Sequence, residues 1–134
     1  MRVLALDYGT ARIGCALSDP SGTVVRPIDV IEPPDPVAVA GLVSEHSVER
    51  VVVGMPVTLN DREGEQARLT REFCAELERT LEVPVETYDE RLTTRMAEAS
   101  RRGGATAAED SLAAAHLLEG YLARQAGRDP GNAA

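Results

Sequence analysis

A chain of 134 residues with 43% hydrophobic and 27% charged residues suffices for one domain with a core, and is too short for two. The net charge of -8, with arginine as the sole basic residue type apart from histidine, argues against a basic protein that coats DNA. Two interpretations of this charge remain open. Either the protein binds no polyanion, or some of its acidic residues hold metal ions that reverse the local charge. No apolar run suits a membrane span or a signal sequence, so we expect a cytoplasmic protein without membrane attachment.

The first third of the chain has the pattern of three antiparallel strands. Residues 3–6 and 13–17 are apolar runs, and the segment between them has the length of a hairpin connection, with Gly9 able to take a positive φ. Residues 19–22 fit a type I turn, with proline second and glycine fourth. This turn leads into a third strand over residues 23–30.

The remaining chain alternates between helices and strands. Helices are expected over residues 36–46, 65–81, 93–102 and 107–125, and strands over 51–53 and 83–88. The order β-β-β-α-β-α-β-α predicts an α/β fold: a five-stranded mixed sheet, with three antiparallel strands followed by parallel additions and helices on both faces. We expect a single domain over residues 1–125 and a flexible tail over 126–134.

The two cysteines, Cys15 and Cys74, lie far apart in apolar segments and lack the spacing of metal ligands. We therefore expect buried free thiols and neither a disulfide nor a zinc site.

Three acidic residues are candidates for a metal site. Asp7 ends the expected central strand, Glu90 follows the last strand, and Asp110 lies in the first turns of the last helix. If the fold brings them together, they need a compensating cation, and oxygen ligands suit Mg²⁺ or Mn²⁺. Each also has another interpretation. Asp7 could accept hydrogen bonds from turn amides, Glu90 could pair with Arg91, and Asp110 could favour a helix N-terminus. Spacing alone leaves both interpretations open.

Four segments resemble the motifs of a known family. They are LDYGTARIG at residues 6–14, VGMP at 53–56, DERLTT at 89–94 and EDSLAA at 109–114. Together and in this order they resemble the YqgF/RuvX family of ribonuclease H-like nucleases, and the resemblance covers about residues 1–125. It implies a ribonuclease H-like fold, a catalytic and metal-binding set of Asp7, Glu90 and Asp110, and Mg²⁺ or Mn²⁺ as cofactor.

The resemblance also implies a function. It indicates a metal-dependent nuclease, a hydrolase of ester bonds, that processes the 5′ end of pre-16S rRNA in ribosome biogenesis. The alternative within the same resemblance is a nuclease that resolves Holliday junctions in DNA. Structured RNA is the favoured nucleic-acid partner and DNA the second, and the protein is expected to be a monomer or a homodimer.

Three further residues in the matched segments are candidates for substrate binding. Arg12 could hold a phosphate or form a structural ion pair. Gly54 could permit the backbone to approach the site closely, or it could merely end a strand. Arg91 could brace Glu90 or contact the substrate.

Two departures from the family pattern bear on the substrate. The basic residues expected before the last acidic motif are reduced to Arg101 and Arg102, which gives a thin surface for nucleic acid. Ala107 stands where junction resolvases commonly have a fourth acid, and Glu109 is a poor substitute. The smaller acidic set favours RNA processing over junction resolution.

Two other classes of function remain open from the sequence. Residues 7–10 also resemble the first phosphate loop of actin-like ATPases and sugar kinases, although those proteins use two such domains. The acidic charge also fits a non-catalytic module that binds ribosomal precursor RNA or a partner protein.

Overall fold

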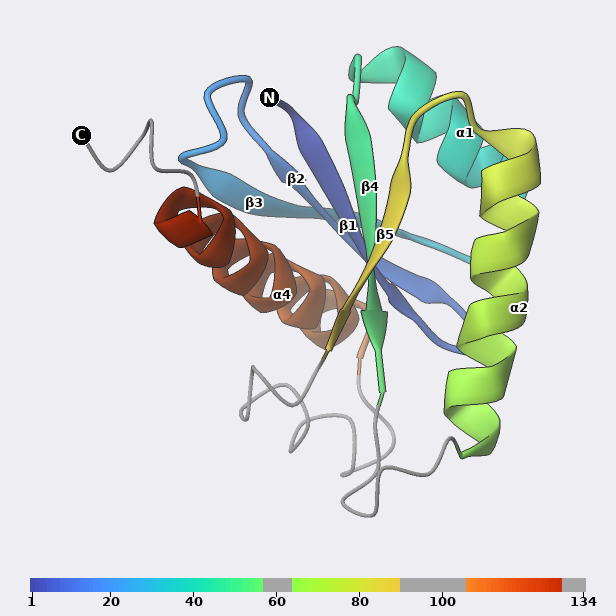
Figure 1. Ribbon diagram of the computed structural model, residues 1–134. Coiled ribbons are helices and arrows are strands. Elements are labelled where there is room, and N and C mark those ends of the chain that lie inside the picture. The colour runs from blue at the N-terminus through green and yellow to red at the C-terminus, as the bar shows by residue number, and fades with distance from the viewer. Residues whose placement is uncertain (57–63, 90–105, 129–134) are drawn as a thin grey trace.

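The computed structural model describes residues 1–56, 64–89 and 106–128. They form one five-stranded sheet in the order β3-β2-β1-β4-β5 (Figure 1). The strands are β1 (Val3–Tyr8), β2 (Ile13–Ser18), β3 (Val25–Ile31), β4 (Arg50–Met55) and β5 (Val85–Asp89). The first three strands are antiparallel, and β4 and β5 add in parallel to β1. The predicted fold class and order of elements are therefore confirmed.

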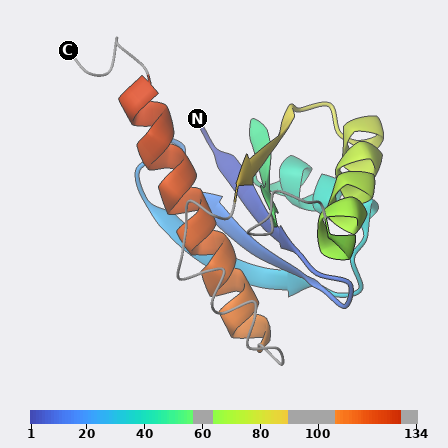
Figure 2. The same cartoon turned by 60° about the horizontal axis from the view of Figure 1, so that its bottom comes forward.

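Helices cover both faces of the sheet. They are α1 (Pro36–Glu45), α2 (Glu65–Thr80) and α4 (Ala107–Arg128). Figure 2 shows α4 alone on one face, with α1 and α2 on the other. The expected helix over residues 93–102 lies outside the described residues. Helix α4 extends to Arg128, so residues 126–128, expected to belong to the tail, continue the helix.

Each face of the sheet has its own core, because strand side chains alternate between faces. On one face, Leu4 and Leu6 pack with residues of α1 and α2, among them Val39, Phe73 and Leu77. On the other face, small strand residues pack against α4. The members of this second cluster are Val3, Ala5, Ala16, Val52, Tyr88, Ala113, Ala114, Ala115, Leu117, Leu118 and Tyr121. The small side chains let α4 lie close to the sheet.

The far half of α4 is fixed by a polar cluster at the start of β4. The Tyr121 hydroxyl donates a hydrogen bond to Glu86 Oε2 at 2.5 Å and accepts one from Arg50 Nη1 at 2.8 Å. The Tyr121 ring also packs edge-on against Tyr88, with 5.9 Å between ring centroids. Burial and the bond to Glu86 raise the pKa of Tyr121. These contacts hold the helix along the sheet.

Two turns connect the first three strands, one around Gly9 and one at residues 19–22. The expected turn at residues 19–22 is present: the Gly22 N–H donates to the Asp19 carbonyl at 2.9 Å, and Gly22 has φ +74°. Gly9 does not use its ability to take a positive φ. Gly9 is required for another reason, since a Cβ there would lie 2.9 Å from the carbonyl oxygen of Arg12.

The cysteines behave as expected. Cys15 and Cys74 are free and buried. Burial raises the pKa of Cys15 to about 12 and that of Cys74 to about 11, so both thiols stay protonated and unreactive near neutral pH. Among the described residues, no helix is long and apolar enough to cross a membrane.

Candidate functional site

The carboxyl ends of three parallel strands share one edge of the sheet. Strand β1 pairs with β4 up to Leu6 and Val53, and β4 pairs with β5 up to Met55 and Asp89. Asp7 follows Leu6, so it lies at this edge beside the end of β4, with the end of β5 one strand further on. Figure 1 shows the three strands side by side. Such an edge is where open α/β sheets commonly bind ligands.

The side chain of Asp7 belongs to the face covered by α4. Val3 and Ala5, the two preceding residues of the same parity, pack in the α4 core, and alternation along β1 assigns Asp7 to that face. The antiparallel partner of Asp7 is Gly14 of β2. Directly opposite residues share a face, so whatever lies above Gly14 lies next to Asp7.

The residue above Gly14 is Asp110 of α4. A Cβ built on Gly14 would lie 2.1 Å from the carbonyl oxygen of Asp110 and 2.4 Å from its carbonyl carbon. No side chain larger than hydrogen fits between β2 and the helix at this point. The missing side chain of Gly14 therefore lets the first turns of α4 bring Asp110 beside Asp7.

Asp110 is held by Arg12 from the hairpin between β1 and β2. The Arg12 Nε donates to Asp110 Oδ2 at 2.5 Å, and the two side chains are 25% and 24% exposed. The bond to Asp110 raises the pKa of the Arg12 guanidinium. Asp110 also lies in the first turn of α4, where an acidic side chain interacts favourably with the helix dipole.

The start of α4 is capped next to this pair. The Thr106 hydroxyl accepts a hydrogen bond from the Glu109 backbone N–H at 3.1 Å, and the Asp110 N–H donates to the Thr106 carbonyl at 3.0 Å. Threonine followed three residues later by glutamate is the signature of a capping box. Glu109 is exposed, and its place in the cap accounts for an acid at this position without a catalytic role.

The backbone after Asp7 is fixed from the opposite face. The Tyr8 ring stacks on Phe73 of α2, with centroids 4.6 Å apart and planes 6° apart. The Tyr8 carbonyl accepts a hydrogen bond from Gln66 Nε2 at 3.0 Å. Burial, with the nearby Glu76 and Glu72, raises the pKa of Tyr8. Helix α2 thus holds the end of β1 from which Asp7 projects.

The remaining predicted site residues fall into two groups. Gly54 is buried and follows Val53, the partner of Leu6, so it lies beside Asp7 on the neighbouring strand. Glu90 and Arg91, together with the basic residues Arg101 and Arg102, lie outside the described residues. Within residues 1–56, 64–89 and 106–128, no group of three or more metal-ligating side chains is present, and the predicted third acid, Glu90, is beyond them.

Gly14 and Ser111 both lie within the matched motifs, but neither is among the site residues expected from the sequence. For Gly14 a signal was present, since a glycine inside an apolar strand often marks close approach of another backbone. A polar residue inside the apolar stretch of α4 is the corresponding signal for Ser111, which is 4% exposed.

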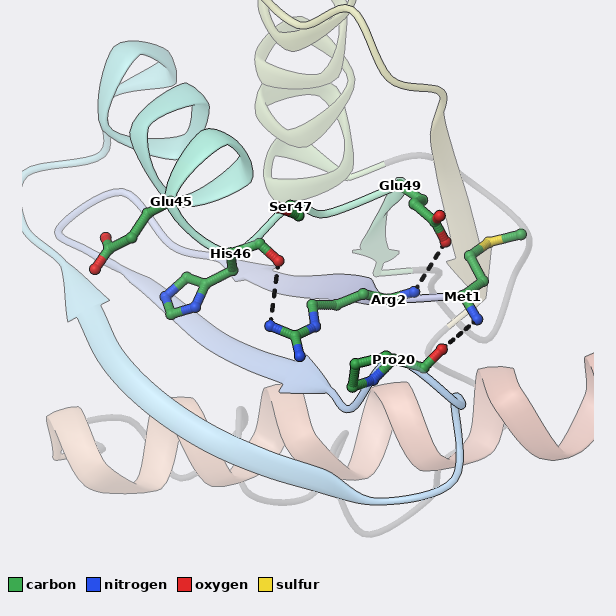
Figure 3. Close-up of a pocket in the computed structure, with 7 residues that line it drawn as sticks. All are labelled: Met1, Arg2, Pro20, Glu45, His46, Ser47 and Glu49. Atoms are coloured by element: carbon green, nitrogen blue, oxygen red, sulfur yellow. Dashed lines mark hydrogen bonds between the residues drawn. The ribbon is translucent and has the colours of Figure 1, made fainter.

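A separate pocket lies at the opposite edge of the sheet, before the start of β1 (Figure 3). It encloses about 400 Å³. Two of its basic groups have protein partners: Arg2 Nη1 donates to the His46 carbonyl at 3.2 Å, and the Met1 amino group donates to the Pro20 carbonyl at 2.6 Å. This pocket is lined by both acidic and basic residues, unlike the edge of the sheet at Asp7, where carboxylates gather.

Comparison with solved structures shows the class of fold. The RuvC protein of Thermus thermophilus in complex with a Holliday junction substrate matches with a TM-score of 0.61 over 93% of this chain and 96% of that one, at 18% identity. The fowlpox virus Holliday junction resolvase matches with a TM-score of 0.53 over 92% of this chain and 99% of that one, at 11% identity. The fold is therefore the ribonuclease H-like fold of the resolvases.

Comparison with sequences shows the family. The profile of the family described as "RuvX: Holliday junction resolvase" matches residues 1–124. A relative from Anaeromyxobacter sp. (strain Fw109-5) is 42% identical over 91% of this chain and 96% of its own length, and one from Desulforamulus reducens is 38% identical over the same shares. Both carry the provisional name of pre-16S rRNA nuclease. The chain belongs to the RuvX family, whose members are nucleases.

Proposed function

We propose that this protein is a divalent-metal-dependent nuclease whose active site contains Asp7, Asp110 and Glu90. The observation that carries the proposal is the packing of the Asp110 backbone directly on Gly14, the antiparallel partner of Asp7: a Cβ built on Gly14 would lie only 2.1 Å from the Asp110 carbonyl oxygen. Glu90 follows the adjacent strand β5 in the sequence and is the third acid of the family motifs. Family membership and the shared fold support the assignment.

The donor set at this edge fits a hard divalent cation. Asp7 and Asp110 supply carboxylate oxygens, which suit Mg²⁺ or Mn²⁺ better than softer metals. These two residues and Glu90 would hold the ion. When bound, it supplies a water of lowered pKa and stabilises the negative charge that develops on the phosphate.

The reaction is hydrolysis of a phosphodiester. A water oxygen forms a bond to phosphorus, the bond from phosphorus to one ester oxygen breaks, and the departing oxygen takes up a proton. Arg12 is the residue of the hairpin that we assign to a phosphate oxygen, because a guanidinium makes strong charge-assisted hydrogen bonds to phosphate. Gly54 leaves the space beside Asp7 free of a side chain.

Precursor 16S rRNA is the substrate that we favour, with cleavage at its 5′ end. The names of the relatives support RNA. The position of a fourth acid is taken by Ala107, and Glu109 belongs to the helix cap, which separates this site from the four-acid sets of junction resolvases. The family description and the RuvC complex support a four-way DNA junction as the second candidate.

A cleavage panel tests the proposal. Precursor rRNA, single-stranded RNA, single-stranded DNA and a four-way junction are each incubated with Mg²⁺ or Mn²⁺. Asp7→Asn and Asp110→Asn are expected to remove cleavage while circular dichroism shows the fold retained. Glu119→Gln is the matched control, an exposed acid farther along α4, and it is expected to cleave as the wild type does. Full activity in Asp7→Asn would refute the site, and RNA binding without cleavage would favour a non-catalytic module.

A further inference from the structure

Ser111 is a buried hydroxyl that follows Asp110 directly. It is 4% exposed, although serine in a helix usually faces water or bonds its own helix. Its hydroxyl reaches across to the sheet. It donates a hydrogen bond to the Ile28 carbonyl of β3 at 2.6 Å and accepts one from the Cys15 N–H of β2 at 3.4 Å. One side chain of α4 therefore contacts the backbones of two strands.

The two backbone groups lie at an irregularity of the sheet. Ile13 pairs with Ile31, whereas Cys15 pairs with Ile28. An advance of two residues along β2 therefore corresponds to three residues along β3. This is the pattern of a β-bulge with its extra residue on β3. The Ser111 hydroxyl bridges the Cys15 N–H and the Ile28 carbonyl at the end of this bulge. Both groups gain a partner from the helix at a place where the ladder is disrupted.

We propose that Ser111 is a positioning residue for Asp110, and this inference rests on the proposed function of the site. At Gly14 the helix touches β2 through backbone atoms alone, and such a contact does not by itself fix how the helix slides or rotates. The Ser111 hydroxyl fixes both motions, because its two bonds diverge to different strands. It thereby sets where the Asp110 carboxylate lies relative to Asp7 and Arg12. Errors of about 1 Å in such a placement are costly for catalysis.

Ser18 offers a matched control within the same sheet. It is 1% exposed, and its hydroxyl also bridges two backbone groups, accepting from the Val3 N–H at 2.8 Å and donating to the Met1 carbonyl at 3.5 Å. It lies at the opposite end of β2 from Gly14 and far from the acidic residues. Ser18→Ala and Ser111→Ala therefore remove comparable hydrogen bonds, one remote from the site and one beside it.

The experiment measures Mn²⁺ binding by titration calorimetry on the full chain without nucleic acid, together with melting temperature. Both variants are expected to melt at a lower temperature than the wild type. Ser111→Ala is expected to bind Mn²⁺ about tenfold more weakly or worse, as for other groups that orient metal ligands. Ser18→Ala is expected to bind it as the wild type does. With a cleavable substrate, Ser111→Ala lowers kcat and leaves KM unchanged.

Equal Mn²⁺ affinity in the two serine variants would overturn the inference and leave the proposed function standing. If wild-type protein shows no Mn²⁺ binding that Asp7→Asn removes, the proposed function fails, and the inference with it. Should Ser111→Ala not fold, Ser111→Cys keeps the size of the side chain and replaces the hydroxyl with a weaker donor. That variant is expected to show the same loss of Mn²⁺ affinity, and wild-type affinity in it would also overturn the inference.

Discussion

Arg12 and Asp110 form an ion pair between residues 98 positions apart in the chain, with Nε and Oδ2 separated by 2.5 Å. The pair joins the hairpin that follows Asp7 to the first turn of α4. It places a permanent positive charge against a carboxylate that we assign to a metal site, so the guanidinium and the proposed metal ion would share the Asp110 carboxylate.

Removing this guanidinium is expected to change metal and nucleic-acid binding in opposite directions. In Arg12→Ala, Asp110 loses its neighbouring positive charge, and Mn²⁺ is expected to bind roughly severalfold more tightly because less charge opposes it. Nucleic acid is expected to bind more weakly, since a phosphate contact is lost. Calorimetry with Mn²⁺ and fluorescence anisotropy with labelled RNA measure the two effects. Weaker binding of both ligands would show that Arg12 acts mainly as a structural brace.

Gly14 is expected to tolerate no side chain. In Gly14→Ala the new methyl would lie 2.1 Å from the Asp110 carbonyl oxygen, so the helix must move away from β2. Overpacking of this kind costs about 1–3 kcal/mol of unfolding free energy, and here it also displaces Asp110. Urea unfolding monitored by circular dichroism checks the stability, and a cleavage assay checks the site.

Gly41→Ala is the control for this substitution. Gly41 lies in the exposed part of α1, and nothing is within 4 Å of its added Cβ. Alanine there is expected to stabilise the protein by about 0.5–1 kcal/mol, because glycine is a poor helix former. A Gly14→Ala variant as stable as Gly41→Ala would contradict the close approach of α4.

Tyr8 is expected to act on the site through its ring and not its hydroxyl. Tyr8→Phe preserves the stack on Phe73 and is expected to keep wild-type stability and activity. Tyr8→Ala removes the ring, and aromatic pairs contribute about 0.5–1.5 kcal/mol beyond their buried area. That variant is expected to lose stability and to need a higher Mn²⁺ concentration for cleavage, because the backbone carrying Asp7 is released. Thermal melts and metal titrations of activity distinguish the two variants.

The turn at Asp19 is expected to make the stability of the fold depend on pH in the acidic range. The Ser21 hydroxyl, followed by the backbone N–H groups of Val24 and Thr23, lowers the pKa of Asp19 from 3.8 to about 2. A carboxylate with a lowered pKa stabilises the fold above its unfolded pKa, and this contribution disappears as the pH falls through the folded pKa. The wild type should therefore be more stable than Asp19→Asn at pH 7, with the difference shrinking between pH 3.8 and 2. Melting temperatures across this range measure it, and a constant difference would contradict the assignment.

The order of strands and helices could be predicted because it depends on local patterns. Apolar runs, a proline at the start of α1 and the turn at residues 19–22 each act within a few residues. A glycine inside β2 indicates close approach of some backbone, but that this backbone belongs to Asp110 could not be predicted, because it depends on how a helix distant in sequence packs on the strand. Gly9 is a second example within a single hairpin. Glycine is required there because the Arg12 carbonyl lies close, and not because of the φ of Gly9.

The candidate site divides in a similar way. Asp7, Asp110 and Arg12 were named from motifs, but spacing could not show that Arg12 pairs with Asp110. The sequence marks Ser111 only as a polar residue in an apolar stretch, and its partners, Cys15 and Ile28, follow from the bulge between β2 and β3. Motifs therefore identified which residues matter, and packing identified how they are held.

The distance along the chain between Arg12 and Asp110 has a consequence for the timing of activity during synthesis. Because Asp110 follows Arg12 by 98 residues, a nascent chain carries Asp7 and its hairpin well before it carries Asp110. The helix must then dock across β2 and β3 before the two carboxylates meet, a long-range contact of the kind that forms late in folding. A nascent chain without α4 would therefore lack the proposed site, and the proposed nuclease activity would depend on the docking of this helix.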